Sequence, residues 1–544
     1  MNLLDRVIGY IAPAAAARRL QARATLQQIM AMSAAPNNIY PQAKTTRTNK
    51  VTLSVYKENE ASSAVTDNLR AQSWRLYRTN PSARKIVRTL QSKVIGRGMH
   101  PEPLAMNADG TPNEAFRDRC KELWKRLNAG FDSRGLPAQG GQTLAGLQRV
   151  ALQAVILSGD ALFRMKPITE ADQKRRDLPI PLTLQLIDSC RLADETEVVS
   201  AEIPAGSSLF RGIELDEENR RTAYYIRLQP AYASANQSGN AKRIPADQMG
   251  HLYVEEDIDQ LRGVPWFSAA LTRTQDTADL EYNVLKSTAL AACVVGAYAK
   301  PTGATKFGLN ASSTAPDDLT DGDGNTVTKL QPGLLVNTGR DGKFELHSPN
   351  QPNMNPEAFV QHLQRGTATA VPGVKSSTIT GDYRNSSFSS ERSADNDIWP
   401  ELHDVQQWFA DNFCQPIYEA VIRAAMVSGF FNDIISSAEF LASPGRFMVA
   451  SWNGPIALSI NPVDDAKAAH DRIKGGLSSL QMECAKLGTN WRDVLANMAE
   501  VYEVAGRLGI PPEILANIMG LPAPRNANEA ADSPTGTDDG QTTQ

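Results

Sequence analysis

Apolar positions recur at helical spacing in the first part of the chain. From Ser62 to Ile95 they follow a helical period that breaks at Asn80-Pro81. The break predicts two helices with a corner, because proline disfavours a helical residue before it and suits the first position of a new helix. A further helix is predicted by the apolar positions Leu144, Leu147, Ala151, Ala154 and Val155. Ser158-Gly159 ends this helix, and the apolar stretch from Ala161 to Met165 predicts a strand after it.

Short segments rich in branched and aromatic residues follow these helices. They are separated by turn residues, as the strands of a small mixed sheet are. The segments are Leu182 to Ile187, Gly212 to Leu215, Ala223 to Leu228 and His251 to Val254. Because helices and strands are mixed within one stretch of chain, we expect an α+β fold.

A long helical run begins near Gly263-Val264-Pro265-Trp266 and continues to Tyr298, with no strand signal inside it. Residues 301 to 352 are then dense in turn-forming residues and predict a small insert. Two short apolar pieces in the insert, Gly333 to Val336 and Phe344 to Leu346, are its candidate strands. Asn355-Pro356 predicts the start of a returning helix, because asparagine caps helices and proline favours their first position.

Residues 373 to 393 are polar and serine-rich, which predicts a flexible loop or a helix break. A long helix follows, and Pro400 and Pro416 are each expected to bend it. Its apolar stripe consists of Leu402, Val405, Phe409, Phe413, Ile417 and Val421. A last helical region is expected from Asp464 to Met519.

The two ends of the chain lack packing material. Residues 34 to 60 are rich in Pro, Asn and Thr, which predicts an extended arm, and residues 524 to 544 form a polar tail. The first residues have an apolar face interrupted by Asp5 and Arg6, so a short amphipathic helix is favoured over a signal peptide.

Composition limits the class of protein. The chain has 544 residues, enough for about three or four units, and its 41% hydrophobic and 21% charged content is typical of folded proteins. The formal net charge of -4 argues against a protein that binds DNA phosphates tightly. Five scattered cysteines without a C-x-x-C pair argue against a disulfide framework and a zinc site, and favour a reducing compartment. No apolar stretch has the length of a membrane helix, so we expect a soluble protein.

Signatures of catalysis are missing from the sequence. It contains no phosphate-binding G-x-x-x-x-G-K-[ST], no G-x-S-x-G and no H-E-x-x-H, and its six histidines show no metal-ligand spacing. Asp321, Asp323 and Asn325 resemble the start of a calcium loop, but Thr326 replaces the required glycine. The basic cluster Lys174-Arg175-Arg176 is flanked by aspartates and is best explained as a solvated turn. Glu255-Glu256-Asp257 would alternate faces on a strand, which disfavours a metal site. We expect no enzyme, no cofactor and no metal.

Two surfaces could contact partners. The helical segment 62 to 95 is basic and could meet either a phosphate backbone or an acidic surface of a neighbouring subunit. Its basic residues are Arg70, Arg75, Arg78, Arg84, Lys85 and Arg88. Trp399, Trp408 and Phe413 could stack on bases, but aromatic residues at helical spacing more often fill cores or interfaces.

The order of these segments resembles the lambda-type family of tailed-bacteriophage portal proteins. Several strings along the chain are similar to family segments in the same order, over roughly residues 62 to 500. They are Arg78-Thr79-Asn80-Pro81-Ser82-Ala83, Val94-Ile95-Gly96-Arg97-Gly98, Leu184-Gln185-Leu186-Ile187-Asp188 with Arg191-Leu192, Arg262-Gly263-Val264-Pro265-Trp266, Gly381-Asp382-Tyr383 with Ser386-Ser387, Phe413-Cys414-Gln415-Pro416-Ile417-Tyr418-Glu419 and Glu483-Cys484-Ala485-Lys486-Leu487-Gly488. The sequence departs from the family in the extra Arg384-Asn385 and serines around Asp382.

The resemblance implies a portal fold with a mixed α/β wing, long stem helices, a small strand-bearing clip, a kinked long helix and a helical crown. The implied divisions are an arm (1 to 60), a first wing part (61 to 265), a stem helix (266 to 298), a clip (299 to 354), a second stem helix (355 to 372), a channel loop (373 to 393), the kinked long helix with the second wing part (394 to 462), a crown (463 to 523) and a disordered tail (524 to 544).

The same resemblance implies a homododecameric ring at one capsid vertex of the virion, assembled in the host cytoplasm. Double-stranded DNA would pass through it nonspecifically during packaging and ejection, and no membrane would be involved. The implied partners are the terminase large subunit, head-completion or connector proteins, and the major capsid and scaffold proteins.

Three sets of candidate residues follow from this resemblance. The channel-loop candidates for facing DNA are Lys375, Tyr383, Arg384 and Asn385. The subunit-interface candidates are Trp399, Trp408, Phe409 and Phe413. The clip candidates for docking terminase or connector proteins are Leu334, Arg340, Lys343 and Phe344.

Two other classes of protein stay open. A minor head or connector protein would bind such a ring without forming the channel, although the helix, clip and helix order argues against it. A packaging enzyme, either a terminase subunit or a maturation protease, would need a Walker loop, a carboxylate metal cluster or a Ser/Lys or Ser/His arrangement, none of which is visible in the sequence.

Overall fold

The computed structural model divides the chain into Met1–Ser62 and Ser63–Gln544. The first unit, which includes the predicted arm, lies outside the described residues. The described residues are 63–193, 198, 203–227, 241–298, 319–320, 326–327, 334–337, 356–382, 387–456, 462–487, 489, 491–511 and 514.

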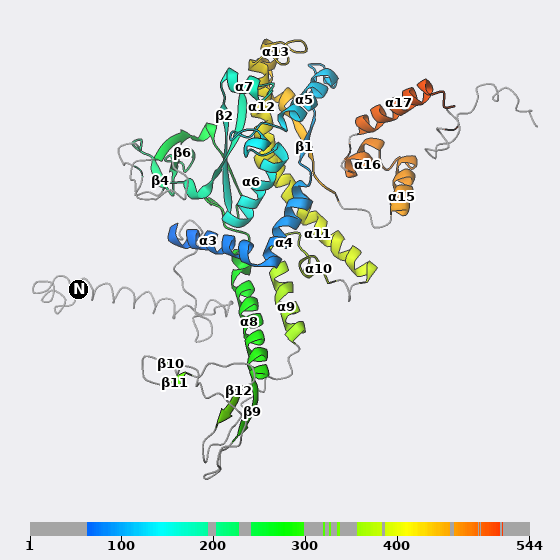
Figure 1. Ribbon diagram of the computed structural model, residues 1–544. Helices are drawn as coiled ribbons and strands as arrows, with labels where there is room; N and C mark the ends of the chain where they lie inside the picture. Colours follow the sequence, from blue (N-terminus) through cyan, green and yellow to red (C-terminus); the bar gives the residue numbers. More distant parts are fainter. Residues whose placement is uncertain are drawn as a thin grey trace, which may run out of the picture. The chain divides into compact units, whose positions relative to one another are not determined.

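Two helices with a corner open the described part, as the sequence predicts. Helix α3 spans Ser63–Thr79 and α4 spans Pro81–Leu90 (Figure 1). Asn80 between them is extended, with φ -104° and ψ 120°, and its side chain accepts hydrogen bonds from the backbone N–H groups of Ser82 and Ala83. The chain then continues as a short π-helix, η3 (Gln91–Ile95), which the sequence pattern does not predict.

The predicted helix and strand between residues 144 and 167 are confirmed. Helix α6 spans Leu144–Ser158, and strand β2 spans Asp160–Pro167. Gly159 between them has φ +86°, a conformation that glycine adopts without strain. Another helix, α5 (Glu114–Leu127), is missing from the sequence prediction although Phe116, Cys120 and other apolar residues on it are buried at helical spacing.

The strands form small antiparallel sheets. One has the order β3-β2-β8, with β3 at Leu182–Asp188 and β8 at Gly250–Tyr253. A second has the order β4-β5-β6-β7, with bounds Ser208–Phe210, Ile213–Leu215, Arg221–Arg227 and Ala241–Pro245. The four predicted strands are confirmed, and β4 and β7 are additional edge strands. Short helical elements connect them: η4 (Pro137–Gln139), α7 (Glu170–Arg175), η5 (Ser189–Arg191) and η7 (Ala246–Gln248).

A pair of neighbouring helices carries the insert. After the turn η8 (Ser268–Ala270), helix α8 spans Leu271–Cys293 and contacts the returning helix α9 (Pro356–Ala368), as Figure 1 shows. The predicted helix does not reach Tyr298, because β9 (Val294–Tyr298) pairs in parallel with β12 (Leu334–Asn337). Two consecutive β-branched valines open β9 and favour the strand. The insert also contains β10 (Leu319–Thr320) and β11 (Thr326–Val327), whereas the predicted strand at 344–346 lies outside the described residues.

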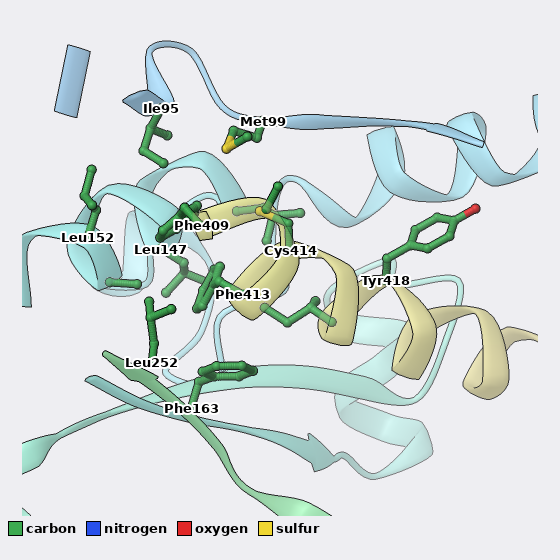
Figure 2. Packing of buried hydrophobic residues seen from close by; sticks show 14 of the residues in the cluster. Ile95, Met99, Leu147, Leu152, Phe163, Leu252, Phe409, Phe413, Cys414 and Tyr418 are labelled. Atoms are coloured by element: carbon green, nitrogen blue, oxygen red, sulfur yellow. The ribbon is translucent and has the colours of Figure 1, made fainter. Parts of the chain in front are cut away.

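The predicted long helix consists of three parts. Helix α11 (Phe388–Phe409) contains Pro400, a π-helix η9 (Ala410–Cys414) follows, and α12 (Gln415–Val427) has Pro416 in its first turn. Its apolar stripe lies in the main core, where Phe409, Phe413, Cys414 and Tyr418 pack among residues of α6, β2 and β8 (Figure 2). The ring centroids of Phe163 and Phe413 are 4.9 Å apart.

The remaining elements complete this unit. Helices α13 (Ser437–Ala442) and α14 (Gly445–Met448) precede strand β13 (Ala450–Asn453), which pairs with β1 (His100–Pro103). The predicted C-terminal helical region is present as α15 (Pro462–Lys474), α16 (Leu480–Lys486) and α17 (Trp491–Arg507). Gly475-Gly476 ends the first of them. Among the described helices, none combines the length and hydropathy that a membrane span requires.

Candidate functional site

A buried ionic cluster joins the β3-β2-β8 sheet to the segment that leads into α8. The carboxylate of Asp160, at the start of β2, is fully buried and lies 2.5 Å from Nε of Arg262. The Arg70 guanidinium from α3 lies 3.4 Å from the other carboxylate oxygen and donates a 2.8 Å bond to the carbonyl of Ser158. Nε2 of His251 lies 3.4 Å from Asp160. We call these four residues the Asp160 cluster.

The charges in the Asp160 cluster depend on one another. Burial alone would raise the pKa of Asp160, but the two arginines and His251 hold it well below its ordinary value. Burial lowers the pKa of His251 to about 4, so this imidazole is neutral at pH 7. Removal of the carboxylate would leave the buried Arg262 guanidinium without its counter-charge and would leave Arg70 only its 3.1 Å ion pair with the exposed Asp67, which is costly in a low-dielectric interior.

Two glycines let the backbone cross closely beside this cluster. A Cβ atom on Gly263 would overlap the carbonyl oxygen of Gly159, and a Cβ atom on Gly159 would overlap that of Gly263. Three residues further on, the backbone N–H of Trp266 donates a 3.1 Å bond to the carbonyl of Ile156. The motif Arg262-Gly263-Val264-Pro265-Trp266 therefore fixes the start of the α8 segment against the end of α6 and the start of β2.

Residues 373–382, the first half of the predicted loop, are docked on α11. The segment contains a short helix, α10 (Ser376–Thr380), and α11 already begins at Phe388, so the loop prediction for 373–393 is only partly right. The backbone N–H of Gly373 donates a 2.7 Å bond to the Glu401 carboxylate. Gly373 has φ +70°, and a Cβ there would lie 2.5 Å from Leu402.

Lys375 is a second contact between this segment and α11. Its Nζ lies 2.6 Å from Asp395 and 3.1 Å from Glu391, and it also donates to the Glu391 carbonyl. Only 9% of the side chain is exposed. The prediction that Lys375 faces DNA is wrong, because burial and two carboxylates already satisfy its charge. Lys375 holds the segment onto the helix instead.

The other channel-loop and clip candidates are mostly untested. Leu334 is the first residue of β12. Outside the described residues lie Tyr383, Arg384, Asn385, Arg340, Lys343 and Phe344, and the calcium-loop residues Asp321, Asp323 and Asn325.

The aromatic interface candidates separate into two groups. Phe409 and Phe413 are 0% and 1% exposed within the single chain, so the prediction that they contact a neighbouring subunit is wrong. Their helical spacing reflects the protomer's own core. Trp399 and Trp408 are half-buried and remain interface predictions.

The basic residues of the segment 62 to 95 also divide into a buried one and exposed ones. Arg70 belongs to the buried Asp160 cluster and is not available to a partner. Arg84, Lys85 and Arg88 lie on the exposed side of α4, opposite the buried Ala83, Ile86, Val87 and Leu90. We call these three exposed residues the basic face. Arg75 and Arg78, near the end of α3, are also exposed.

An acidic surface was missed by the sequence prediction. Asp397, Glu401, Asp404 and Asp411 are exposed along α11 and η9 at intervals of four, three and seven residues. This spacing places them on one side of the helix, and we call them the acidic stripe. The signal was present in the sequence, because residues 393–422 contain six Asp or Glu and no Lys or Arg.

Side chains with catalytic potential are not brought together in the part of the chain that is described. No group of three His, Cys, Asp or Glu residues suitable for a metal is found there. Burial raises the pKa of the Cys120 thiol to about 12 and raises that of Cys414 as well, so neither is a reactive thiolate. In the Lys174-Arg175-Arg176 turn, Lys174 and Arg175 form exposed ion pairs with Glu170 and Asp172.

Comparison with known proteins decides the family. The family model described as phage portal protein, lambda family, matches residues 44–406. The chain belongs to this family. Among curated relatives, the portal protein of Escherichia phage N15 is 22% identical over 334 residues, and portal protein B of Escherichia phage lambda is 20% identical over 326 residues. Each match covers 55% of this chain and about 60% of the relative's own length.

Solved structures give a weaker likeness to this portal-family chain. A structure described as the neck of a native GTA particle, computed with C12 symmetry, is 14% identical, with a TM-score of 0.37 over 79% of this chain and 94% of that chain. A structure described as the virion of a native gene transfer agent particle is 15% identical, with a TM-score of 0.32 over 84% and 94% of the two chains. The family assignment therefore rests on the sequence.

Proposed function

We propose that this chain forms the ring channel at one capsid vertex through which double-stranded DNA is packaged and ejected. The observation that carries the proposal is the family match over residues 44–406. The role is structural, and the energy for DNA movement would come from the terminase, whose large subunit is a proposed partner.

The stem geometry supports this role. Helices α8 and α9 contact each other, and the insert between them begins with β9 and contains β12, paired in parallel. The start of α8 is fixed to the wing sheet by the Asp160 cluster and the Gly159–Gly263 crossing. A wall that keeps its shape while DNA moves past it requires such a connection, because packed, hydrogen-bonded elements resist deformation.

The charge balance suits a conduit. Tight neutralisation of phosphates gives strong, salt-dependent binding, which would stop DNA from sliding. The chain has 56 basic and 60 acidic residues. Lys375, the lysine of the docked segment 373–382, already forms ion pairs with Glu391 and Asp395 of α11. We therefore propose nonspecific and weak contact with DNA, with Tyr383, Arg384 and Asn385 as the remaining candidates.

The insert is the proposed docking site for other assembly proteins. Residues 299 to 354 would form a clip that contacts the terminase and later the head-completion or connector proteins, with Leu334, Arg340, Lys343 and Phe344 as candidates. The major capsid and scaffold proteins would surround the wing. Assembly would take place in the host cytoplasm, and the finished ring of about a dozen subunits would remain in the virion.

A complementation experiment tests this function. Heads assembled in cells that lack the chain should contain no DNA, and supply of the chain from a plasmid should restore DNA-filled heads. A chain truncated within the insert should still enter heads but should leave them empty, because the proposed terminase contact is lost. DNA-filled heads in the absence of the chain would overturn the proposal and favour a minor head protein.

A further inference from the structure

One largely helical stretch of this chain carries only positive charges, and another carries only negative charges. Residues 68–101 contain eight Lys or Arg and no Asp or Glu, whereas residues 393–422 contain six Asp or Glu and no Lys or Arg. The whole chain is close to neutral, with a net charge of -4. The charges are therefore segregated between two surfaces rather than mixed over one.

The basic face is not neutralised within the protomer. Among the described residues, the side chains of Arg84, Lys85 and Arg88 form no ion pair, and the Arg84 guanidinium lies 5.7 Å from the centroid of the Tyr77 ring. Lys85 and Arg88 are three residues apart and Arg84 and Arg88 four, so their like charges repel on one side of the helix. Such an arrangement costs helix stability unless an anionic partner covers it.

The acidic stripe is similarly open. In the described part of the chain, Asp397 and Asp404 have no ion pair. The Asp411 carboxylate accepts a 2.9 Å hydrogen bond from the Gln407 side chain, and the Glu401 carboxylate accepts one from the Gly373 backbone N–H. The half-buried Trp408 lies between Asp404 and Asp411 on the same side of the helix. Although η3 contacts α11, no ion pair in the described chain joins the basic face to the acidic stripe of the same protomer.

We infer that the basic face of one copy of this chain docks on the acidic stripe of the next copy in a ring. The inference rests on the proposed ring and identifies the surfaces that close it. A ring uses a heterologous interface, in which two different surfaces of the same chain meet at every contact. Opposite charges on those surfaces select the head-to-tail orientation and suppress contact between like surfaces.

Nucleic acid is the other polyanion that could cover the basic face. The acidic stripe favours a second copy, because the chain then supplies its own complementary surface of similar extent, with three positive charges facing four negative ones. DNA would leave the stripe unexplained. The two occupants predict different results when the charges are exchanged.

Charge exchange between two variants tests the inference. The first variant carries Arg84→Glu, Lys85→Glu and Arg88→Glu, and the second carries Asp397→Lys, Asp404→Lys and Asp411→Lys. Glu401 is left unchanged because it accepts the Gly373 backbone bond. Each variant alone presents two surfaces of the same sign, so we expect ring formation near physiological salt to weaken on the order of a hundredfold. An equal mixture should form rings again, because each variant complements the other.

A matched control separates this effect from a change in net charge. The control variant carries Lys125→Glu, Lys174→Glu and Arg175→Glu. These three substitutions at exposed cations change the net charge by the same amount as the first variant, and the control should form rings like the unaltered chain. Circular dichroism of each monomer checks folding, and ring content is measured by sedimentation velocity and electron microscopy.

The possible outcomes distinguish a second copy of the chain from DNA as the partner of the basic face. Rings of the unaltered chain and of both charge variants alone would overturn the inference while the proposed function stands. Rings in the first variant together with loss of duplex DNA binding would assign the basic face to DNA. Failure of the mixture to form rings, with both variants folded, would also overturn the inference. Failure of the unaltered chain to form rings would instead count against the proposed function.

Discussion

Asp160→Asn is the substitution that most directly probes how the segment leading into α8 is attached to the β3-β2-β8 sheet. Asparagine keeps the size of the side chain but removes the negative charge that faces Arg262 at 2.5 Å and Arg70 at 3.4 Å. Both guanidinium groups are less than 10% exposed, so water cannot replace the lost charge. Breaking a buried ion pair by removing one partner costs about 3–5 kcal/mol, and we expect a loss of that size in the free energy of unfolding.

Equilibrium urea unfolding of the monomer, followed by far-ultraviolet circular dichroism, measures this loss. Glu170→Gln is a suitable control, because its ion pair with Lys174 is exposed and should contribute less than about 1 kcal/mol. Adding Arg70→Met to Asp160→Asn should recover part of the stability, since it removes a buried charge whose remaining ion pair is with the exposed Asp67. A loss below about 1 kcal/mol for Asp160→Asn, or no coupling to Arg70→Met, would refute the reasoning.

Three further predictions concern the same junction and the docked segment. Because burial lowers the pKa of His251 to about 4 while the unfolded chain binds this proton near pH 6.5, stability should be complete above pH 6.5 and fall by about 3 kcal/mol as the pH drops to 4. His251→Gln should flatten this dependence in urea unfolding at both pH values, and an unchanged slope would contradict the assignment. Gly263→Ala should cost about 1–3 kcal/mol through overlap with the Gly159 carbonyl, whereas Gly445→Ala, with open space around it, should cost little in the same assay. Lys375→Met should increase amide hydrogen exchange across residues 373–382, because the ion pairs of Lys375 with α11 are lost. The control Lys125→Met should leave this exchange unchanged. Equal exchange in both variants would show that Lys375 does not hold the segment.

Much of the fold follows from local sequence rules. The corner at Asn80-Pro81, the end of α6 at Gly159 and the start of α9 at Pro356 are set by residues with strong backbone preferences, and all were predicted. The α5 helix could have been predicted as well, because Asn113 caps it and its apolar residues have helical spacing.

Other features depend on contacts between distant residues. The π-helices η3 and η9 add one residue to a helical turn where the chain packs in the core, and apolar periodicity does not reveal such a shift. Strand β1 pairs with β13 about 350 positions later, and its sequence HPEP contains two prolines that disguise it.

The candidate site shows the same limit. A periodic stripe containing Phe409 and Phe413 indicates burial but not whether the covering surface is the protomer or a neighbour. Sequence alone indicates exposed cations at Lys375 and Arg70, because nothing near them in the sequence identifies Asp395 or Asp160 as a partner. The uninterrupted acidic and basic stretches, by contrast, were readable from the sequence.

Closure of this portal-family chain into a ring around a channel is tested most directly by negative-stain electron microscopy of the purified protein, with its mass in solution measured in parallel. We expect rings of about a dozen subunits with a central hole wide enough for duplex DNA. A persistent monomer over varied salt and protein concentration would rule out ring closure.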